Sequence, residues 1–314
     1  MNHPTLAVEL ADFGSFHAGG RAYRIAGEPV ARLQIAPGLQ LDHDPNGNYQ
    51  IESCYVQYWI PRRVSGEPIL LIHGGGLSGV CWETTPDGRP GWVQRLVAAG
   101  RPVYVADMME RGRAGWCALP DVWDGPAIMR TTYEAWWLFR FGPATDFPLR
   151  RAFDGQRFPV DALDAFMKQA VPRWLNNTDA AIAAFSAAIE RIGPCTVITH
   201  SSGGVYGYRL AFDQPGLVRD VISLEPSTFP GEVPASLVGQ RFLHVMGAYL
   251  DEVPWSDLDR RTREWAARLE RAGALTEHRS LEDDGLPGHS HMFMMGHGNE
   301  HVLERVLAWL NERS

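Results

Sequence analysis

Ser201 is the residue of this sequence that best fits a nucleophile. It lies in the segment VITHSSGGV (residues 197–205), where an apolar run enters a short turn and a second apolar stretch leaves it. This is the layout of a nucleophile elbow, usually written G-x-S-x-G, in which a strained turn exposes the serine between small neighbours. Thr199 and Gly203 occupy those neighbouring positions. Threonine is small, but it departs from the glycine of the motif. With a histidine as general base, such a serine can attack a carbonyl carbon and form an acyl-enzyme.

Two other interpretations of this segment stay open. Ser202 is an equal candidate by composition, although the spacing to Gly203 favours Ser201. A serine in a string of this kind can also cap a helix without any catalytic role. The neighbouring motifs therefore have to decide between these interpretations.

A glycine run could supply hydrogen-bond donors for a developing oxyanion. His73-Gly-Gly-Gly76 follows the apolar run 69–72, and acyl transfer needs preorganised N–H groups of this kind. In such sites one donor belongs to the residue after the nucleophile, here Ser202, and the other to this loop, where we expect Gly75 and then Gly76. Alone, the run would be a plain turn. The elbow about 125 residues downstream, in the expected order, favours the oxyanion role.

The general base is expected on a loop before the last helix, and the segment GLPGHSHMFM (285–294) is such a loop. We choose His291, because the apolar stretch 292–294 could anchor it. His289 is the runner-up. His297 and His301 are expected at the surface of the helix start, and His244 within a strand is expected to be a core residue.

The acid that should orient the histidine has two candidate positions. In most proteins with this motif order it follows the strand before the last, which points to Asp251 or Glu252. Glu225 ends the preceding apolar run, 221–224, and a buried carboxylate there would need a partner such as a histidine. From the residues alone, Asp251 and Glu225 remain alternatives.

The elements that must position these residues alternate along the chain. Short apolar runs at 69–72, 103–106, 196–198, 221–224 and 242–245 suit central parallel strands, and 54–60 suits an outer strand. Helical patterns recur between them, near 92–97, 182–192, 205–210, 258–269 and 302–310. The sequence therefore predicts an α/β protein, with a mostly parallel central sheet flanked by helices.

One region breaks this alternation. From residue 114 to 177 there is no clear strand, but many tryptophans, phenylalanines and prolines occur. We interpret residues 114–177 as a helical cap that is inserted into a core made of residues 1–113 and 178–314 and that covers a pocket. A simple extension of the core is the alternative, because aromatic residues more often pack than bind substrate.

Composition limits the classes of protein that fit. The chain has 314 residues, 45% hydrophobic and 21% charged, and a net charge of −8, which argues against a general nucleic-acid or anionic-membrane surface. We expect no membrane span, and a cytoplasmic protein unless a signal peptide once preceded the chain. The four cysteines are too scattered for a disulfide scaffold, and the histidine-rich tract lacks a carboxylate spacing for a metal. We expect no cofactor.

Several motifs resemble a small family of bacterial α/β-hydrolases, the esterase 713 family. They are HGGGLSGVCWETTPDG (73–88), ERGR (110–113), LEP (224–226) and SHMFM (290–294), within a similarity that spans about residues 19–310. The resemblance implies the α/β-hydrolase fold and a serine esterase activity.

The resemblance also implies which residues form the triad. The family uses a serine, a glutamate after the sixth strand and a histidine, which fall on Ser201, Glu225 and His291. It therefore moves our choice of acid to Glu225. Two departures are Thr199 in the elbow and Gly75-Gly76, where the typical member has paired cysteines.

The expected function is carboxylic ester hydrolysis by a carboxylesterase-type enzyme, acting through an acyl-enzyme on Ser201. The aromatic cap favours a hydrophobic or aromatic small-molecule ester. Amidase, lactonase, acyltransferase or lyase chemistry on the same triad is the alternative, because fold does not fix function, and a non-catalytic binding module comes last. The expected partner is the small-molecule substrate, with a homodimer left open.

Overall fold

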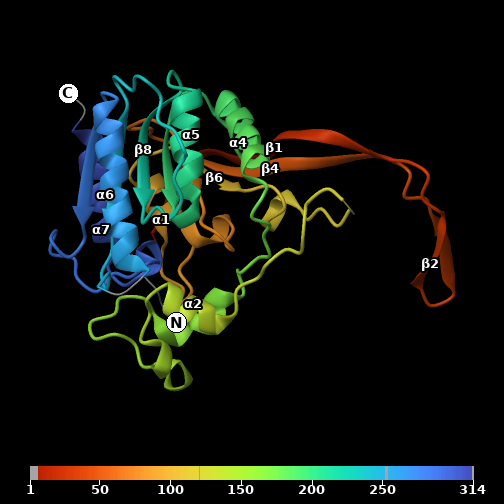
Figure 1. The fold of residues 1–314 in the computed structure, drawn as a ribbon, viewed down its shortest axis with the longest axis horizontal. Coiled ribbons are helices and arrows are strands. Elements are labelled where there is room, and N and C mark those ends of the chain that lie inside the picture. Colours follow the sequence, from red (N-terminus) through yellow and green to blue (C-terminus); the bar gives the residue numbers. More distant parts are fainter. Residues whose placement is uncertain (1–5, 120, 252–253, 313–314) are drawn as a thin grey trace.

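The computed structural model describes residues 6–119, 121–251 and 254–312. Within them, eight strands form one sheet in the order β1-β4-β6-β5-β7-β8-β9-β10 (Figure 1). Their bounds are β1 Leu10–Ile25, β4 Gly47–Pro61, β5 Ile69–Ile72, β6 Val103–Asp107, β7 Cys195–His200, β8 Val218–Leu224, β9 Arg241–Met246 and β10 Leu275–Ser280. Neighbouring strands from β6 to β10 in this order pair in parallel, whereas β4 pairs antiparallel with both β6 and β1. This confirms the expected α/β architecture with a mostly parallel sheet.

Helices cover both faces of the sheet. The main ones are α1 Trp92–Ala98, α4 Thr178–Ile192, α5 Gly204–Asp213, α6 Trp255–Arg271 and α7 Asn299–Asn311. Successive residues of β5 point to opposite faces, so Ile69 and Leu71 pack in the core that holds α1 and α7. Leu70 and Ile72 pack in the core that holds α4, α5 and α6. Both faces of the sheet at β5 are therefore buried in apolar cores, and this explains why the sequence of β5 is an unbroken apolar run.

A long arm leaves the body of the protein (Figure 1). It consists of the outer parts of β1 and β4 and, at its end, the hairpin of β2 Ala31–Ala36 and β3 Leu39–His43. Every residue of this hairpin is exposed. The sequence analysis missed β1 and the hairpin, although the hairpin strands ARLQIA and LQLDH alternate apolar and polar residues.

Much of the aromatic segment 114–177, including α2, lies beyond the ends of the central strands (Figure 1). Its described residues contain two short α-helices, α2 Thr132–Leu138 and α3 Leu163–Met167, several 3-10 turns, and an isolated bridge between Ile128 and Arg173. Five of its aromatic side chains are buried in the same core as α1 and α7: Trp136, Phe139, Phe141, Phe158 and Phe166. No helix among the described residues is long and apolar enough to cross a membrane.

Candidate active site

Ser201 lies at the sharp turn between β7 and α5. Its φ is +53°, in the left-handed region that residues with a side chain seldom adopt, and a 3-10 turn, Ser201–Gly203, leads directly into α5. A side-chain carbon on Gly203 would lie 2.8 Å from the carbonyl oxygen of His73. The turn thus has the strain and the close backbone approach of a nucleophile elbow.

The structure gives a reason for threonine in place of glycine at position 199. A side-chain carbon on Gly207 in α5 would lie only 2.7 Å from Cγ2 of Thr199. The missing side chain at Gly207 therefore leaves the space that the threonine methyl fills. The Thr199 hydroxyl also lies 3.3 Å from the Ser223 hydroxyl, within hydrogen-bond distance.

Glu225 and His291 form a buried pair. Glu225 follows β8 with a φ of +45°, and its Oε2 is 2.5 Å from Nδ1 of His291. Its Oε1 accepts hydrogen bonds from the backbone N–H of Gly247, at 2.8 Å, and from the guanidinium of Arg140. Burial opposes ionisation of Glu225, but Arg140 and His291 outweigh it, and the pKa of Glu225 lies well below its usual value. The carboxylate is therefore ionised.

Arg140 is a part of this site that the sequence analysis missed. Its side chain is 3% exposed, its Nε donates to the carbonyl oxygen of Ala248 at 2.8 Å, and its guanidinium lies over the Trp255 ring at 4.4 Å. The available signal was the string WWLFRF (136–141), since an arginine inside a buried aromatic run needs an anionic partner.

His291 is enclosed by rings. Phe139 stacks on it with ring centroids 5.1 Å apart, and Trp255 lies at the same centroid distance. Burial lowers the pKa of His291, Glu225 raises it, and the positive charges of Arg140 and Arg130 lower it, with a net decrease. The imidazole is therefore neutral near pH 7, as a general base must be.

His200 connects His291 to the elbow. Its Nε2 is 3.0 Å from the backbone carbonyl oxygen of His291, and the two rings are 4.4 Å apart. Because His200 directly precedes Ser201, this contact brings the histidine loop beside the elbow. Ser227 contributes a second tie, since its backbone N–H donates to the Ser201 carbonyl at 3.1 Å and its hydroxyl lies 3.5 Å from the Ser201 hydroxyl.

The competing residues lie elsewhere. His289 is buried without a hydrogen-bond partner for Nδ1, and burial lowers its pKa to about 4. His244 is a core residue of β9, as expected, whereas His297 and His301 are exposed. Asp251 is exposed and lines a cavity of about 310 Å³ together with Arg140 and Trp255. Glu252 lies outside the described residues.

His73 fixes the conformation of the glycine loop. Its Nε2 accepts from the backbone N–H of Met108 at 3.0 Å, which leaves Nδ1 to donate to the carbonyl oxygen of Gly74 at 2.8 Å. Because a peptide unit is planar, the N–H of Gly75 points away from that carbonyl. A side-chain carbon on Gly74 would lie 3.0 Å from Cβ of Ser201, and one on Gly75 would lie 2.8 Å from Oγ of Ser202. The loop thus lies against both serines.

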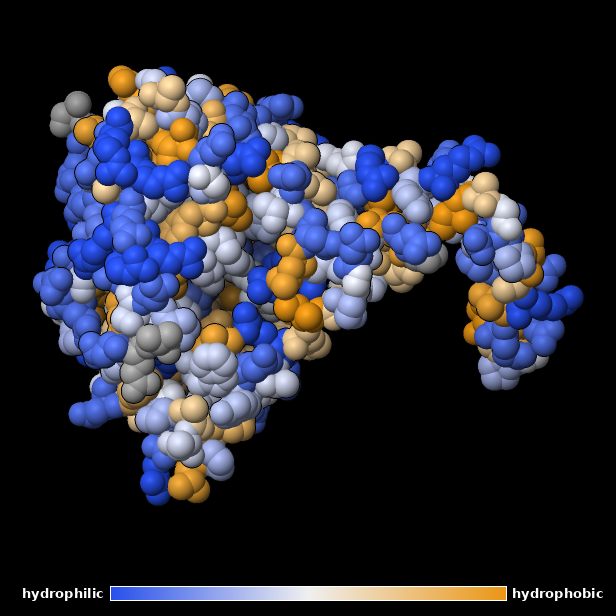
Figure 2. Space-filling model, viewed as in Figure 1, coloured by the Kyte–Doolittle hydropathy of each residue, from blue (hydrophilic) through white to orange (hydrophobic). Residues whose placement is uncertain are grey.

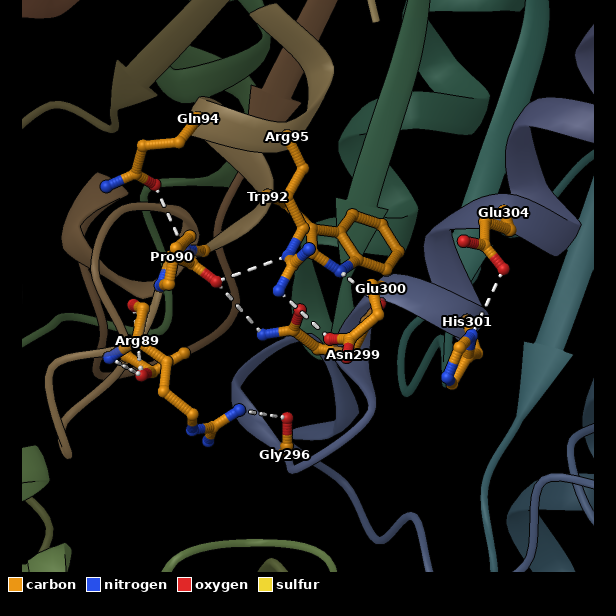
Figure 3. Close-up of polar contacts among 12 residues, drawn as sticks. Arg89, Pro90, Trp92, Gln94, Arg95, Gly296, Asn299, Glu300, His301 and Glu304 are labelled. Carbon is orange, nitrogen blue, oxygen red and sulfur yellow. Dashed lines mark hydrogen bonds and ion pairs between the residues drawn. The ribbon is translucent and has the colours of Figure 1, made fainter. Parts of the chain in front are cut away.

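The segment that follows the histidine loop is held by contacts with residues 89–95. Figure 3 shows Arg89 reaching the backbone of Gly296, with Nη1 2.8 Å from its carbonyl oxygen. Trp92 donates to the carbonyl oxygen of Asn299 at 3.2 Å, and Arg95 pairs with Glu300 at 3.0 Å. These contacts join segment 89–95 to the segment that follows His291.

Comparison with known proteins agrees with this geometry. A solved structure described as a novel bacterial esterase superposes with a TM-score of 0.84, at 29% sequence identity, over 99% of this chain and 98% of that one. The protein is an esterase of the α/β-hydrolase fold. A probable secreted lipase, phiG, of a fungal species (strain ATCC 74256) is 27% identical in an alignment that covers 85% of this esterase and 88% of the lipase. No protein-family model matches the sequence.

The esterase carries no obvious metal centre in its described part. Across residues 6–119, 121–251 and 254–312, no group of three or more His, Cys, Asp and Glu side chains is arranged to hold a metal ion. The four cysteines, Cys54, Cys81, Cys117 and Cys195, are free and buried.

Proposed function

We propose that this esterase cleaves small-molecule carboxylic esters through an acyl-enzyme, with Ser201 as nucleophile, His291 as general base and Glu225 as the acid that orients the histidine. One observation carries the proposal. The buried Glu225–His291 pair lies against His200, the residue before a serine held at a φ of +53°. This arrangement offers an activated serine at the end of a parallel strand.

In the proposed reaction, neutral Nε2 of His291 takes the Ser201 hydroxyl proton while Oγ attacks the ester carbon. The imidazolium is stabilised by ionised Glu225, and it then gives the proton to the departing alcohol. A water molecule, deprotonated by the same imidazole, attacks the acyl-enzyme and releases the carboxylic acid and the free serine. We assign the N–H groups of Ser202 and Gly75 as the donors to the oxyanion.

We further propose that segment 114–177 is a cap on a core of residues 1–113 and 178–314. Two of its residues support this role, because Phe139 stacks on His291 and Arg140 binds Glu225. The cap would then complete the site as well as cover it. Trp137 and Phe153 of this segment line the cavity beside Arg140, which favours a hydrophobic or aromatic group in the ester.

The experiment that tests the proposed function is a hydrolysis assay with 4-nitrophenyl acetate and butyrate. Wild type should release 4-nitrophenol and acid, and Ser201→Ala should fall to the uncatalysed rate. Added methanol should yield little methyl ester, which separates hydrolysis from acyl transfer. Full activity in Ser201→Ala would contradict the assignment, and methyl ester as the main product would identify a transferase.

We also propose that two copies associate through the arm. An isolated two-stranded hairpin is marginally stable in water, and this one exposes Leu33, Ile35, Leu39 and Leu41. Figure 2 shows hydrophobic, orange-coloured surface at the end of the arm. Light scattering should give a dimer mass, and replacing residues 29–45 by a short glycine linker should give a monomer. A monomeric wild type would contradict this.

A cytoplasmic location is proposed on the strength of four free cysteines, since thiols persist in reducing compartments. Cell fractionation tests it, and recovery outside the cytoplasm would overturn it.

A further inference from the structure

Two arginines of the cap segment lie over the glycine loop. A side-chain carbon on Gly75 would be 1.9 Å from Nη1 of Arg173, and the same nitrogen is 3.4 Å from the hydroxyl of Ser202. A side-chain carbon on Gly76 would be 3.9 Å from Cδ of Arg130. The Arg173 guanidinium therefore lies beside the loop and the serine that follows the nucleophile, and the aliphatic part of the Arg130 side chain lies next to the loop at Gly76. The charge of Arg130 acts on Arg173, whose pKa it lowers after the larger effect of burial.

The backbone of the cap fixes this placement. The N–H of Val171 donates to the carbonyl oxygen of Gly76 at 3.0 Å, and Ile128 and Arg173 exchange two backbone hydrogen bonds of 2.8 and 2.9 Å. Arg130 follows Ile128 by two residues. Both arginines are thus held by ordered backbone and do not lie on a free loop.

A third arginine approaches from the core. Arg111 is 4% exposed, its Nη1 donates to the carbonyl oxygen of Gly74 at 3.3 Å, and its Nε is buried without a hydrogen-bond partner. Burial, and then the charge of Arg173, lower the pKa of Arg111 to about 10, whereas the Tyr206 hydroxyl raises it. Arg111 and Arg173 therefore place two positive charges close together at the glycine loop.

These three arginines lack carboxylate partners. Among the described residues, neither Arg111 nor Arg130 nor Arg173 is within ion-pair distance of an Asp or Glu. By contrast, Arg140 pairs with Glu225 and Arg113 pairs with Asp107. The buried Nε of Arg130 also has no hydrogen-bond partner. Clustered, partly buried cations without anions are costly, so an anion supplied from outside would stabilise them.

Support of the glycine loop accounts for only one of these three arginines. Arg111 supports Gly74, but Arg130 makes no side-chain hydrogen bond to any described residue, and Arg173 makes one long one, to Ser202. Arg130 and Arg173 are half-buried, so part of each remains open to a ligand. Guanidinium groups bind planar carboxylates with paired hydrogen bonds.

We propose that the substrate is a half-ester of a dicarboxylic acid or a similar anionic ester, whose free carboxylate binds Arg130 and Arg173 while Ser201 attacks the neighbouring ester carbonyl. The inference deepens the proposed function and rests on it. It changes the expected substrate from a purely apolar ester to one with a carboxylate a few bonds from the scissile bond.

The test compares two esters that differ in one charge. They are the mono-4-nitrophenyl ester of glutaric acid and its methyl-capped counterpart, with Ser201→Ala as the blank for self-hydrolysis. Wild type should favour the acid by about tenfold or more in kcat/KM, since a charged hydrogen-bonded pair contributes that much. Arg130→Gln and Arg173→Gln should each lower this preference by about tenfold, mainly through a higher KM for the acid. The exposed Arg62→Gln, with the same change in net charge, should keep it.

The outcomes distinguish a failure of the carboxylate inference from a failure of the proposed function. Equal rates on both esters, or a preference that survives both arginine variants, would overturn the carboxylate inference and leave ester hydrolysis intact. No release above the blank from either ester would overturn the proposed function as well. If an arginine variant fails to fold, the carboxylate inference is tested on the wild type by inhibition of 4-nitrophenyl acetate hydrolysis. Glutarate should inhibit at a lower concentration than dimethyl glutarate. Equal inhibition by the two compounds would contradict the inference.

Discussion

Glu225 Oε2 and His291 Nδ1 are 2.5 Å apart, and Arg140 contacts the other oxygen of the same carboxylate. Three segments distant in sequence meet at this point: the end of β8, the loop before α7 and the aromatic segment 114–177. Arg140 opposes protonation of Glu225, and the ionised Glu225 holds the imidazole with Nε2 available as a base. Segment 114–177 therefore contributes to the electrostatics of the site through Arg140.

Removing Arg140 should impair this pair and shift its titration. Arg140→Met should lower kcat/KM by about 100-fold, because the histidine loses its fixed orientation. The charge of Arg140 lowers the pKa of His291, so its loss should move the acid limb of the pH–rate profile to higher pH. Arg140→Lys, which keeps the charge, should restore much of that shift. An unchanged acid limb in Arg140→Met would contradict this account.

The glycine loop should not tolerate a side chain beside the nucleophile. In Gly74→Ala the added carbon would lie 2.7 Å from Nδ1 of His200 and 3.0 Å from Cβ of Ser201. We expect kcat/KM to fall by about 100-fold, as it does when an oxyanion donor is displaced. Gly216→Ala is the control, because its added carbon meets nothing within 4 Å. Equal activity of the two variants would rule out this role for the loop.

Thr199 and Gly207 should behave as a coupled pair. Gly207→Ala would press its methyl against Cγ2 of Thr199 at 2.7 Å, so the free energy of unfolding should fall by about 1–3 kcal/mol. Thr199→Ser removes that methyl and keeps the hydroxyl, and in the double variant it should recover part of the loss. Urea denaturation of all four proteins measures the coupling, and strictly additive effects would show that the two residues do not interact.

The protein should lose stability in mild acid. Burial holds the pKa of His73 near 4 and that of His244 near 3, and it also lowers the pKa of His200, His289 and His291. The unfolded chain binds protons on these groups near pH 6.5, and the folded chain does not. Their contribution is therefore complete above about pH 6.5 and is lost as the pH falls towards the folded pKa values. Tm should drop by several degrees between pH 7.5 and pH 5, and a flat profile would contradict this.

Much of the catalytic core could be predicted from the sequence, because buried parallel strands are short apolar runs that end in functional residues. β5, β6, β7, β8 and β9 were all predicted within three residues of their bounds. The exposed hairpin of the arm was missed although its strands, ARLQIA and LQLDH, alternate apolar and polar residues. An alternation over five or six residues is a weak signal when no neighbouring strand or core is evident. β10 was missed because its residues, LTEHRS, are mostly polar and only partly buried.

The choice between Glu225 and Asp251 needed more than the residues. Both follow apolar runs; the family resemblance favoured Glu225, and the structure places Glu225, not Asp251, against His291. The arginines were missed for a similar reason. Arg111, Arg130 and Arg173 are scattered over 63 positions, and the bridge between Ile128 and Arg173 that gathers two of them has no local sequence signal.

The central claim is that Ser201 is an activated nucleophile. Intact-protein mass after incubation with a small fluorophosphonate, with wild type beside Ser201→Ala and Ser202→Ala, tests it most directly. We predict one phosphonyl adduct on wild type and on Ser202→Ala, and none on Ser201→Ala. An adduct that persists in Ser201→Ala, or its absence from wild type, would contradict the assignment.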